Sequence, residues 1–164
     1  MSPEDLEEMQ DELDQSADMD ADLVLQADNP KDVVGASKLP LHLWPATATA
    51  LGAIALHNGA CKYGRANWRV VGVRASRYID ALRRHVAAWD EGEEADEEGI
   101  PHLASALACL AILVDARAAG KLKDDRQYPG GYRSLVDQLT PLVAEVTDRH
   151  SGKDPKHYTI QDAQ

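Results

Sequence analysis

The chain has 164 residues, contains no Phe and carries a formal net charge of −11. This acidic excess argues against sequence-independent binding to duplex nucleic acid and against binding to anionic membranes, because both need surplus Lys and Arg. The N-terminus lacks the basic and apolar segments of a signal peptide, and no stretch approaches the ~18 apolar residues of a membrane span. We therefore expect a soluble, cytoplasmic protein.

Charge is distributed in blocks along the chain. Residues 1–32 contain 12 acids and one Lys, whereas residues 33–84 contain eight bases and one acid. Residues 85–98 contain seven acids and no base, and residues 99–164 are balanced. A basic segment therefore directly precedes an acidic one.

The length and the charge blocks predict one central domain with two extensions. Residues 1–32 form an acidic leader, which is either disordered or carries a short helix over 3–13 that docks on a partner. Residues 33–150 form a single helical domain, and residues 151–164 form a polar tail.

Helical periodicity begins at residue 45 and predicts a helix that ends at Gly64, a residue suited to the position after a helix. Residues 65–75 are expected to form a loop. Ser76 is then the expected N-cap of a second helix that stops near Gly92. Tyr78, Leu82, His85 and Trp89 share one face of this helix because they recur at steps of four, three and four.

Pro101 marks the start of a third helix that runs to Gly120 and is apolar nearly all round, as in a helix buried in a bundle or a subunit interface. A fourth helix is expected over residues 134–150, with a break at Pro141. No clear strand pattern is present. The sequence thus predicts an all-α fold, a bundle of four to five helices. Cys61 and Cys109 are both expected to be reduced and buried.

The acidic run between the second and third helices has two interpretations. It is either a solvated loop or a site for a hard divalent cation, which prefers oxygen ligands. Glu93 and Asp96 are three residues apart, as are Glu94 and Glu97, and this spacing would place each pair on one face if the run were helical.

A histidine stands at each end of this run, and a helix hairpin can bring the two together. His85 lies on the apolar face of its helix, so it is either a packed core residue or part of a site. His102 lies in the first turn of the next helix, where it can be a metal ligand, a proton carrier or a cap.

The basic segment is either a solvated face that balances the acids or a clamp for a polyphosphate. A polyphosphate site needs carboxylates for Mg²⁺ and cations for the remaining phosphates, and the two are neighbours in this sequence. Lys62, Arg77 and Arg84 are the candidate phosphate ligands. Asn67 and Trp68 lie among the bases and can hold a nucleobase, although Trp68 can equally be a packing residue.

Three segments, HNGACKYGRANW, SRYIDALRRHVAAWDEGEEADEEGIPHLASAL and DDRQYPGG, resemble a phage and prophage family described as dATP/dGTP diphosphohydrolase, N-terminal. That family is similar in outline to the all-α MazG-like nucleoside triphosphate pyrophosphohydrolases. The resemblance covers roughly residues 38–131. The positions that match its pattern are Lys62, Tyr63, Gly64, Asn67, Trp68, Ser76, Arg77, Tyr78, Arg84, His85, Trp89, Gly92, Glu93, Asp96, Glu98, Gly99 and His102.

The resemblance implies a phage-encoded, homo-oligomeric enzyme of the host cytoplasm. It would use Mg²⁺ or Mn²⁺ to cleave a purine deoxynucleoside triphosphate into the monophosphate and pyrophosphate. The implied metal ligands are Glu93, Asp96 and Glu98, with Asp115 a further possibility. The implied catalytic residues are Glu93, Asp96, His85 and His102. The implied substrate-binding residues are Lys62, Tyr63, Asn67, Trp68, Arg77 and Arg84.

Two alternative functions remain open. Ser105 and Cys109 stand where the family pattern has His and Asn, which favours a protein that binds or sequesters a nucleotide without cleaving it. The other alternative is a phage structural or host-interaction protein that uses the acidic leader to dock. Deleting residues 1–32 would distinguish this last alternative, because it would abolish partner binding and leave nucleotide handling unchanged.

Overall fold

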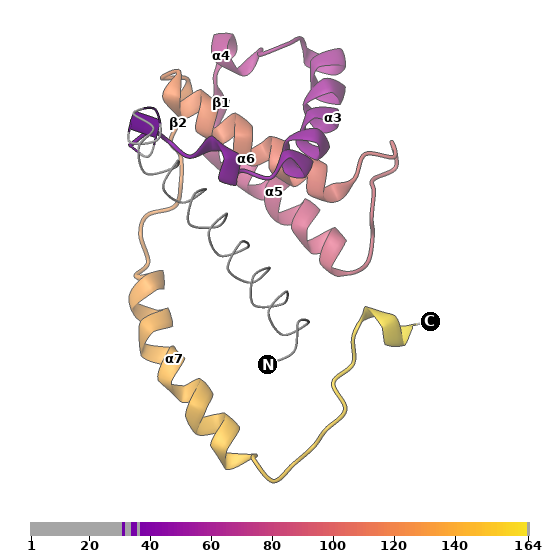
Figure 1. Cartoon of the computed structure of the whole chain (residues 1–164), viewed down its shortest axis with the longest axis vertical. Helices are drawn as coiled ribbons and strands as arrows, with labels where there is room; N and C mark the ends of the chain where they lie inside the picture. Colours follow the sequence, from indigo (N-terminus) through magenta and orange to yellow (C-terminus); the bar gives the residue numbers. More distant parts are fainter. Residues whose placement is uncertain (1–30, 32–33, 36, 164) are drawn as a thin grey trace, which may run out of the picture. The chain divides into compact units, whose positions relative to one another are not determined.

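The computed structural model describes residues 31, 34–35 and 37–163 (Figure 1). The chain divides into two compact units, Met1–Trp44 and Pro45–Gln164. In the first unit, the described part includes the 3-10 helix η1, Leu41–Leu43. The predicted docking helix at residues 3–13 and the predicted boundary at residues 32–33 lie outside the described residues.

The second unit is helical, which confirms the all-α prediction; its likeness to the MazG fold stays a prediction. Its α-helices are α3 (Ala46–Tyr63), α4 (Trp68–Val71), α5 (Ala75–Asp90), α6 (His102–Ala118) and α7 (Tyr132–Arg149). It also contains two-residue strands, β1 (Val73–Arg74) and β2 (Leu122–Lys123), and the 3-10 helix η2 (Ile160–Ala163). Among the residues with described structure, no helix is long and apolar enough to cross a membrane.

The predicted ends of the main helices are largely confirmed. Gly64 follows α3 with a φ of 88°, a left-handed conformation that glycine adopts at little steric cost. Pro101 occupies the N-cap position of α6, where its missing N–H removes no helical hydrogen bond. Gly120 follows the other end of α6, also with positive φ.

The segment before α5 differs from the prediction. Residues 65–75, expected to be a loop, contain the short helix α4 and the strand β1. Ser76 is not the N-cap, because α5 begins at Ala75. Instead, the backbone N–H and the hydroxyl of Ser76 donate to the two carboxylate oxygens of Asp125, each at 2.9 Å. The hydroxyl thus joins two segments that are distant in sequence.

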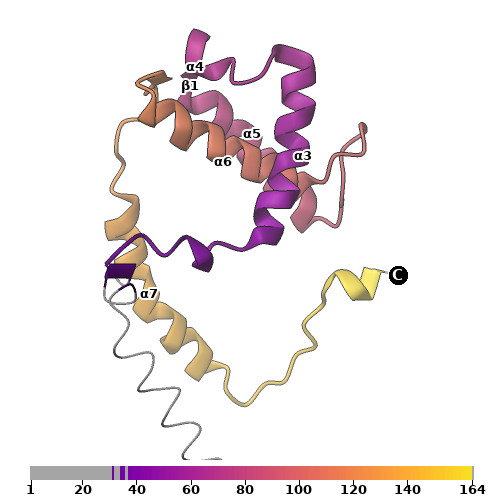
Figure 2. The same cartoon turned by 45° about the horizontal axis from the view of Figure 1, so that its top comes forward.

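Strands β1 and β2 form a small parallel pair at the end of the α5–α6 pair opposite the acidic loop, in register Val73↔Leu122 and Arg74↔Lys123 (Figure 2). The sequence did not predict them, because two residues are too few to show alternation. Gly72 allows this pairing: a Cβ at that position would lie 2.8 Å from the carbonyl oxygen of Lys121, which accepts the N–H of Val73.

Helix α7 contradicts the prediction of a break at Pro141, because it is continuous from Tyr132 to Arg149. Proline removes one backbone donor, and the turns on either side keep their own hydrogen bonds. Thr140, just before it, donates its hydroxyl to the carbonyl of Val136 at 2.8 Å.

The core lies between α3, α5 and α6, and its most extensive helix contacts join α6 to the other two. Its buried apolar residues have small side chains: Ala75, Ala104, Ala106, Ala108, Cys109 and Ala116. Alanines allow close approach of the helices, and Gly52 of α3 lies against the Leu107 side chain.

Helix α6 only partly meets the expectation of a buried helix. Leu110 and Val114 on its other faces are exposed, and the expected packing of such a face on a second copy stays a prediction. Cys109 is buried and free, as expected. The same prediction was wrong for Cys61, which is exposed and whose Sγ lies 3.8 Å from Nε2 of the exposed His57.

Candidate functional site

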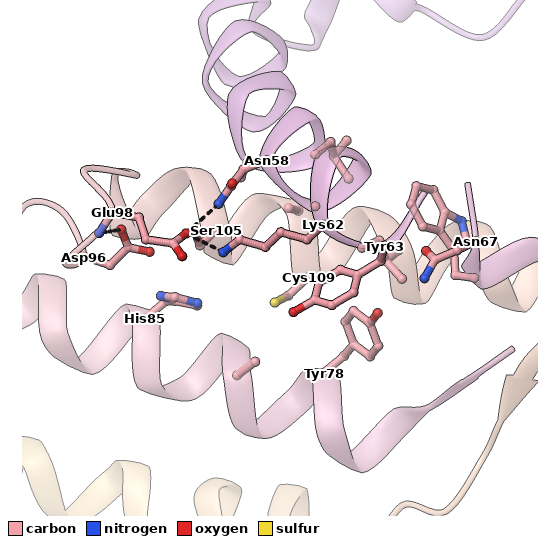
Figure 3. A pocket seen from close by; sticks show the side chains of 17 residues that line it. Asn58, Lys62, Tyr63, Asn67, Tyr78, His85, Asp96, Glu98, Ser105 and Cys109 are labelled. Carbon is pink, nitrogen blue, oxygen red and sulfur yellow. Dashed lines mark hydrogen bonds and ion pairs between the residues drawn. The ribbon is translucent and has the colours of Figure 1, made fainter. Parts of the chain in front are cut away.

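A pocket of about 350 Å³ opens between α3, α5, α6 and the acidic loop (Figure 3). This volume lies within the range of small-molecule sites. Seven of the predicted site residues line it: Lys62, Tyr63, Asn67, Trp68, His85, Asp96 and Glu98. The basic and acidic segments therefore meet in space as well as in sequence.

Four predicted residues do not line the pocket. Arg77 and Arg84 lie exposed on α5. His102 is buried behind His85, and Glu93 lies beside His102. Arg84 still acts on the site at a distance, because its charge contributes to lowering the pKa of His85.

Asn58 and Tyr78 line the pocket but were not predicted as site residues. Helical spacing carried a signal for both. Asn58 is four residues before Lys62, and Tyr78 is seven residues before His85, so each shares a helix face with a predicted residue.

The carboxylate of Glu98 closes one side of the pocket. It forms a short ion pair with Lys62 and accepts a hydrogen bond from Asn58 Nδ2 at 2.9 Å (Figure 3). These contacts lower the pKa of Glu98, and the hydrogen bond to Glu98 raises the pKa of Lys62. An anion bridging a lysine and an asparagine shows that this corner of the pocket suits negatively charged oxygen.

Asp96 organises the acidic loop. Its Oδ1 accepts the backbone N–H groups of Glu98 at 3.0 Å and Ile100 at 2.9 Å. Its backbone N–H donates to the carbonyl of Ile100 at 3.0 Å, next to a bridge between Ala95 and Pro101. The loop is therefore a tight turn rather than a helix, and the helix-face argument for pairs of carboxylates three residues apart does not apply.

The two histidines converge, as their positions at the ends of a helix hairpin predicted. Their Nδ1 atoms are 3.0 Å apart, so one ring donates and the other accepts. His102 is buried, and its Nε2 lies 3.5 Å from Glu93 Oε1 without a hydrogen bond from the described residues. Desolvation first, and then the neighbouring His102, lower the pKa of His85, which favours a neutral ring beside the pocket.

Trp68 is held by an acid of α6 rather than left free. Its indole N–H donates to Asp115 Oδ2 at 2.5 Å, and Arg69 binds both oxygens of the same carboxylate. The hydrogen bonds from Arg69 and Trp68 lower the pKa of Asp115 to about 2. Asp115 therefore anchors Trp68 and Arg69, which leaves it poorly suited to the suggested role of metal ligand.

The fit of a magnesium ion to these residues is limited. Within the part of the chain that the structure describes, no group of three or more His, Cys, Asp or Glu side chains could hold a metal ion. Glu98 is engaged by Lys62, and one oxygen of Asp96 is used within the loop. These residues do not form a ready-made magnesium centre, and the metal stays a prediction.

Comparison with known proteins assigns the chain that forms this pocket to a family. The model of the family described as dATP/dGTP diphosphohydrolase, N-terminal, matches residues 28–126, which is more than half of the chain. The chain belongs to this family. The match includes α3, α4, α5, the acidic loop and α6, and therefore all of the pocket.

The chain is similar to a protein of Salmonella phage PMBT28 that is named dATP/dGTP diphosphohydrolase. It is 32% identical over 118 residues, covering 71% of this chain and 40% of the relative. The chain thus corresponds to well under half of that protein. No solved structure matches the chain.

Proposed function

We propose that the chain binds a purine deoxynucleoside triphosphate in this pocket and hydrolyses it to the monophosphate and pyrophosphate. The observation that best supports this is the pocket lining, which combines Lys62 and Asn58 for an anion with aromatic side chains for a base. The named activity of the phage relative points to the same substrate class.

Without substrate, Lys62 and Asn58 hold the Glu98 carboxylate. A phosphate group carries the same kind of oxygen with more charge, so it would replace Glu98 on these two donors. Lys62 would then stabilise the charge that develops on the phosphates as the bond breaks. Release of Glu98 would also free the loop to move when substrate enters.

His85 is suited to take the proton of the attacking water. Its ring lines the pocket, and its lowered pKa keeps it neutral, which is the form that accepts a proton. The water oxygen would attack the α-phosphorus, the bond to the bridging oxygen would break, and pyrophosphate would leave. His102, bonded to the other side of His85, would orient the ring.

Magnesium dependence belongs to the same proposal. Mg²⁺ typically takes one or two carboxylates together with phosphate oxygens and water, and it would supply charge neutralisation at the phosphates. Asp96 lines the pocket and uses only Oδ1 for its loop hydrogen bonds, which leaves Oδ2 for such an ion. Homo-oligomer formation is likewise proposed, on the exposed apolar residues of α6.

Incubation of the purified full chain with each deoxynucleoside triphosphate and Mg²⁺ tests the proposal, with pyrophosphate and monophosphate as the measured products. The matched control is the Lys62→Ala/His85→Ala double variant. Turnover of dATP or dGTP above this control is expected, and its absence for every nucleotide would refute the hydrolase.

Nucleotide binding without cleavage is the second candidate. The absence of a three-ligand metal group among the described residues favours it. Calorimetry separates the two functions: heat of binding for a triphosphate without product after prolonged incubation supports sequestration.

A further inference from the structure

The pocket has two chemically different ends. The anionic and cationic side chains Lys62, Glu98 and Asp96 gather with His85 at one end, next to the acidic loop. Figure 3 shows Tyr63, Tyr78 and Asn67 at the other end, toward the start of α4 and α5. A nucleotide has the same polarity, with a charged phosphate chain at one end and a flat aromatic base at the other.

Resting on the proposed function, we infer that Tyr78 and Tyr63 form the base-binding end of the pocket, with Asn67 reading the edge of a purine. Trp68 is a fixed wall of this end.

The orientation of Trp68 is fixed by hydrogen bonding. Its indole N–H is engaged by Asp115, and the bidentate pair between Arg69 and Asp115 fixes that carboxylate in turn. The ring orientation is thus set by α6 through Asp115. A ring held in this way is suited to a fixed wall of the pocket.

Tyr78 and Tyr63 reach the base-binding end of the pocket from different helices. Tyr78 comes from α5 and is half-buried, so it forms a stable floor. Tyr63 is the last residue of α3 and is 71% exposed, so its ring is free to move over a bound base. Aromatic rings stack on any base, because every base has a π-face.

Asn67 supplies the discrimination that stacking lacks. It occupies the N-cap position of α4, yet its side chain makes no capping hydrogen bond. Its carboxamide therefore keeps a donor and an acceptor for a ligand. A purine presents a matching pair on one edge, such as N6 and N7 of adenine.

Two substitutions of Tyr78 test the inference in the full chain. Tyr78→Phe keeps the ring, whereas Tyr78→Leu keeps apolar bulk without an aromatic face. The probes are an α,β-imido analogue of dATP with Mg²⁺, which carries a base, and inorganic tripolyphosphate with Mg²⁺, which does not. Tyr128→Leu is the matched control, because Tyr128 is 95% exposed and lies outside the pocket.

We expect Tyr78→Leu to weaken binding of the dATP analogue by roughly tenfold, because the variant loses the stacking of the base on an aromatic ring. Tripolyphosphate affinity should be unchanged in Tyr78→Leu. Tyr78→Phe should bind the dATP analogue more tightly than Tyr78→Leu does, and the Tyr128 control should bind both probes like the wild type. Asn67→Ala should weaken binding of the dATP analogue more than binding of the corresponding dTTP analogue.

The outcomes separate this inference from the function on which it rests. If the wild type binds the dATP analogue and Tyr78→Leu binds it equally well, the base site is elsewhere and the proposed function stands. If Tyr78→Leu weakens both probes equally, Tyr78 supports the fold rather than the base. If the wild type binds neither probe, the proposed function fails and this inference fails with it.

Discussion

The two ends of the α5–α6 helix pair differ in how fully their acidic side chains are bound by other residues. At the end with β1 and β2, Asp115 and Asp125 each receive hydrogen bonds from dedicated partners in another segment. At the loop end, Lys62 and Asn58 hold Glu98, but Asp96 is committed through one oxygen only, and Glu93 lies 3.5 Å from His102 without a hydrogen bond among the described residues. The contacts of Asp115 and Asp125 hold elements together, whereas Asp96 and Glu93 leave charge available for a ligand.

The comparison implies that changes at the loop end should impair nucleotide handling with little loss of stability, and that changes at the strand end should do the reverse. Unfolding temperature and turnover, measured on the same variants, test this division directly.

His85→Ala should have the largest effect. Loss of a general base lowers kcat by about 100-fold or more. His57→Ala is the control, since His57 is an exposed histidine of α3 outside the pocket. Equal turnover of both variants would remove His85 from the proposed mechanism and weaken the assignment of function to the loop end.

Lys62→Ala should have the next largest effect. The variant loses a charge-assisted hydrogen bond to the phosphates, so kcat/KM should fall roughly 10- to 100-fold. The unfolding temperature should change little, because exposed ion pairs stabilise proteins weakly. Lys123→Ala, on β2, serves as the control. A marked loss of stability in Lys62→Ala with normal turnover would show that Lys62 stabilises the fold and does not take part in nucleotide handling.

Asp125→Ala tests the strand end. It leaves the half-buried Ser76 hydroxyl and the Ser76 N–H without their acceptor, so the unfolding temperature should fall by several degrees. KM for the nucleotide should be unchanged. Asp154→Ala, at an exposed position in the tail, should leave both quantities unchanged. A selective rise in KM would show that the strand end also takes part in binding.

The smallest expected effect is a pH dependence of Asp115→Asn. The folded pKa of Asp115, about 2, lies below its ordinary value of 3.8, so the ionised form stabilises the fold. That contribution is complete above the unfolded pKa and is lost as the pH falls through the folded one. The difference in unfolding temperature between wild type and variant should therefore be constant from pH 7 to 5 and narrow below pH 4. A constant gap down to pH 2.5 would contradict the ion pair.

The sequence predicted the ends of the helices better than it predicted which side chains contact one another. Glycines and prolines at helix ends act locally, so the positions of Gly64 and Pro101 marked real ends. Ser76 looked like an N-cap because caps are also local, but its partner Asp125 lies 49 residues away. Periodicity assigns a residue to a helix face without saying which neighbour covers that face, and this is why Cys61 was wrongly expected to be buried.

The site shows the same limit. The pairing of His85 with His102 followed from a helix hairpin, and the meeting of Lys62 with the acidic loop followed from adjacent charge blocks. The turn made by Asp96 could not be predicted, because a carboxylate that binds its own backbone has the same sequence signature as one that awaits a cation. Tyr78 matched the family pattern and lay on an apolar helix face, but neither signal showed that its ring lines the pocket.

The alanine-rich face of α6 makes the pocket width adjustable. Ala108 is buried, lines the pocket and presents a single methyl group to it. Larger side chains there would narrow the cavity and would also press on the neighbouring helices, because Ala108 belongs to the buried core. A short series at this one position, from Gly through Ser to Val, would therefore show how much added volume the helix packing tolerates and how far that volume changes which ligand sizes are accepted.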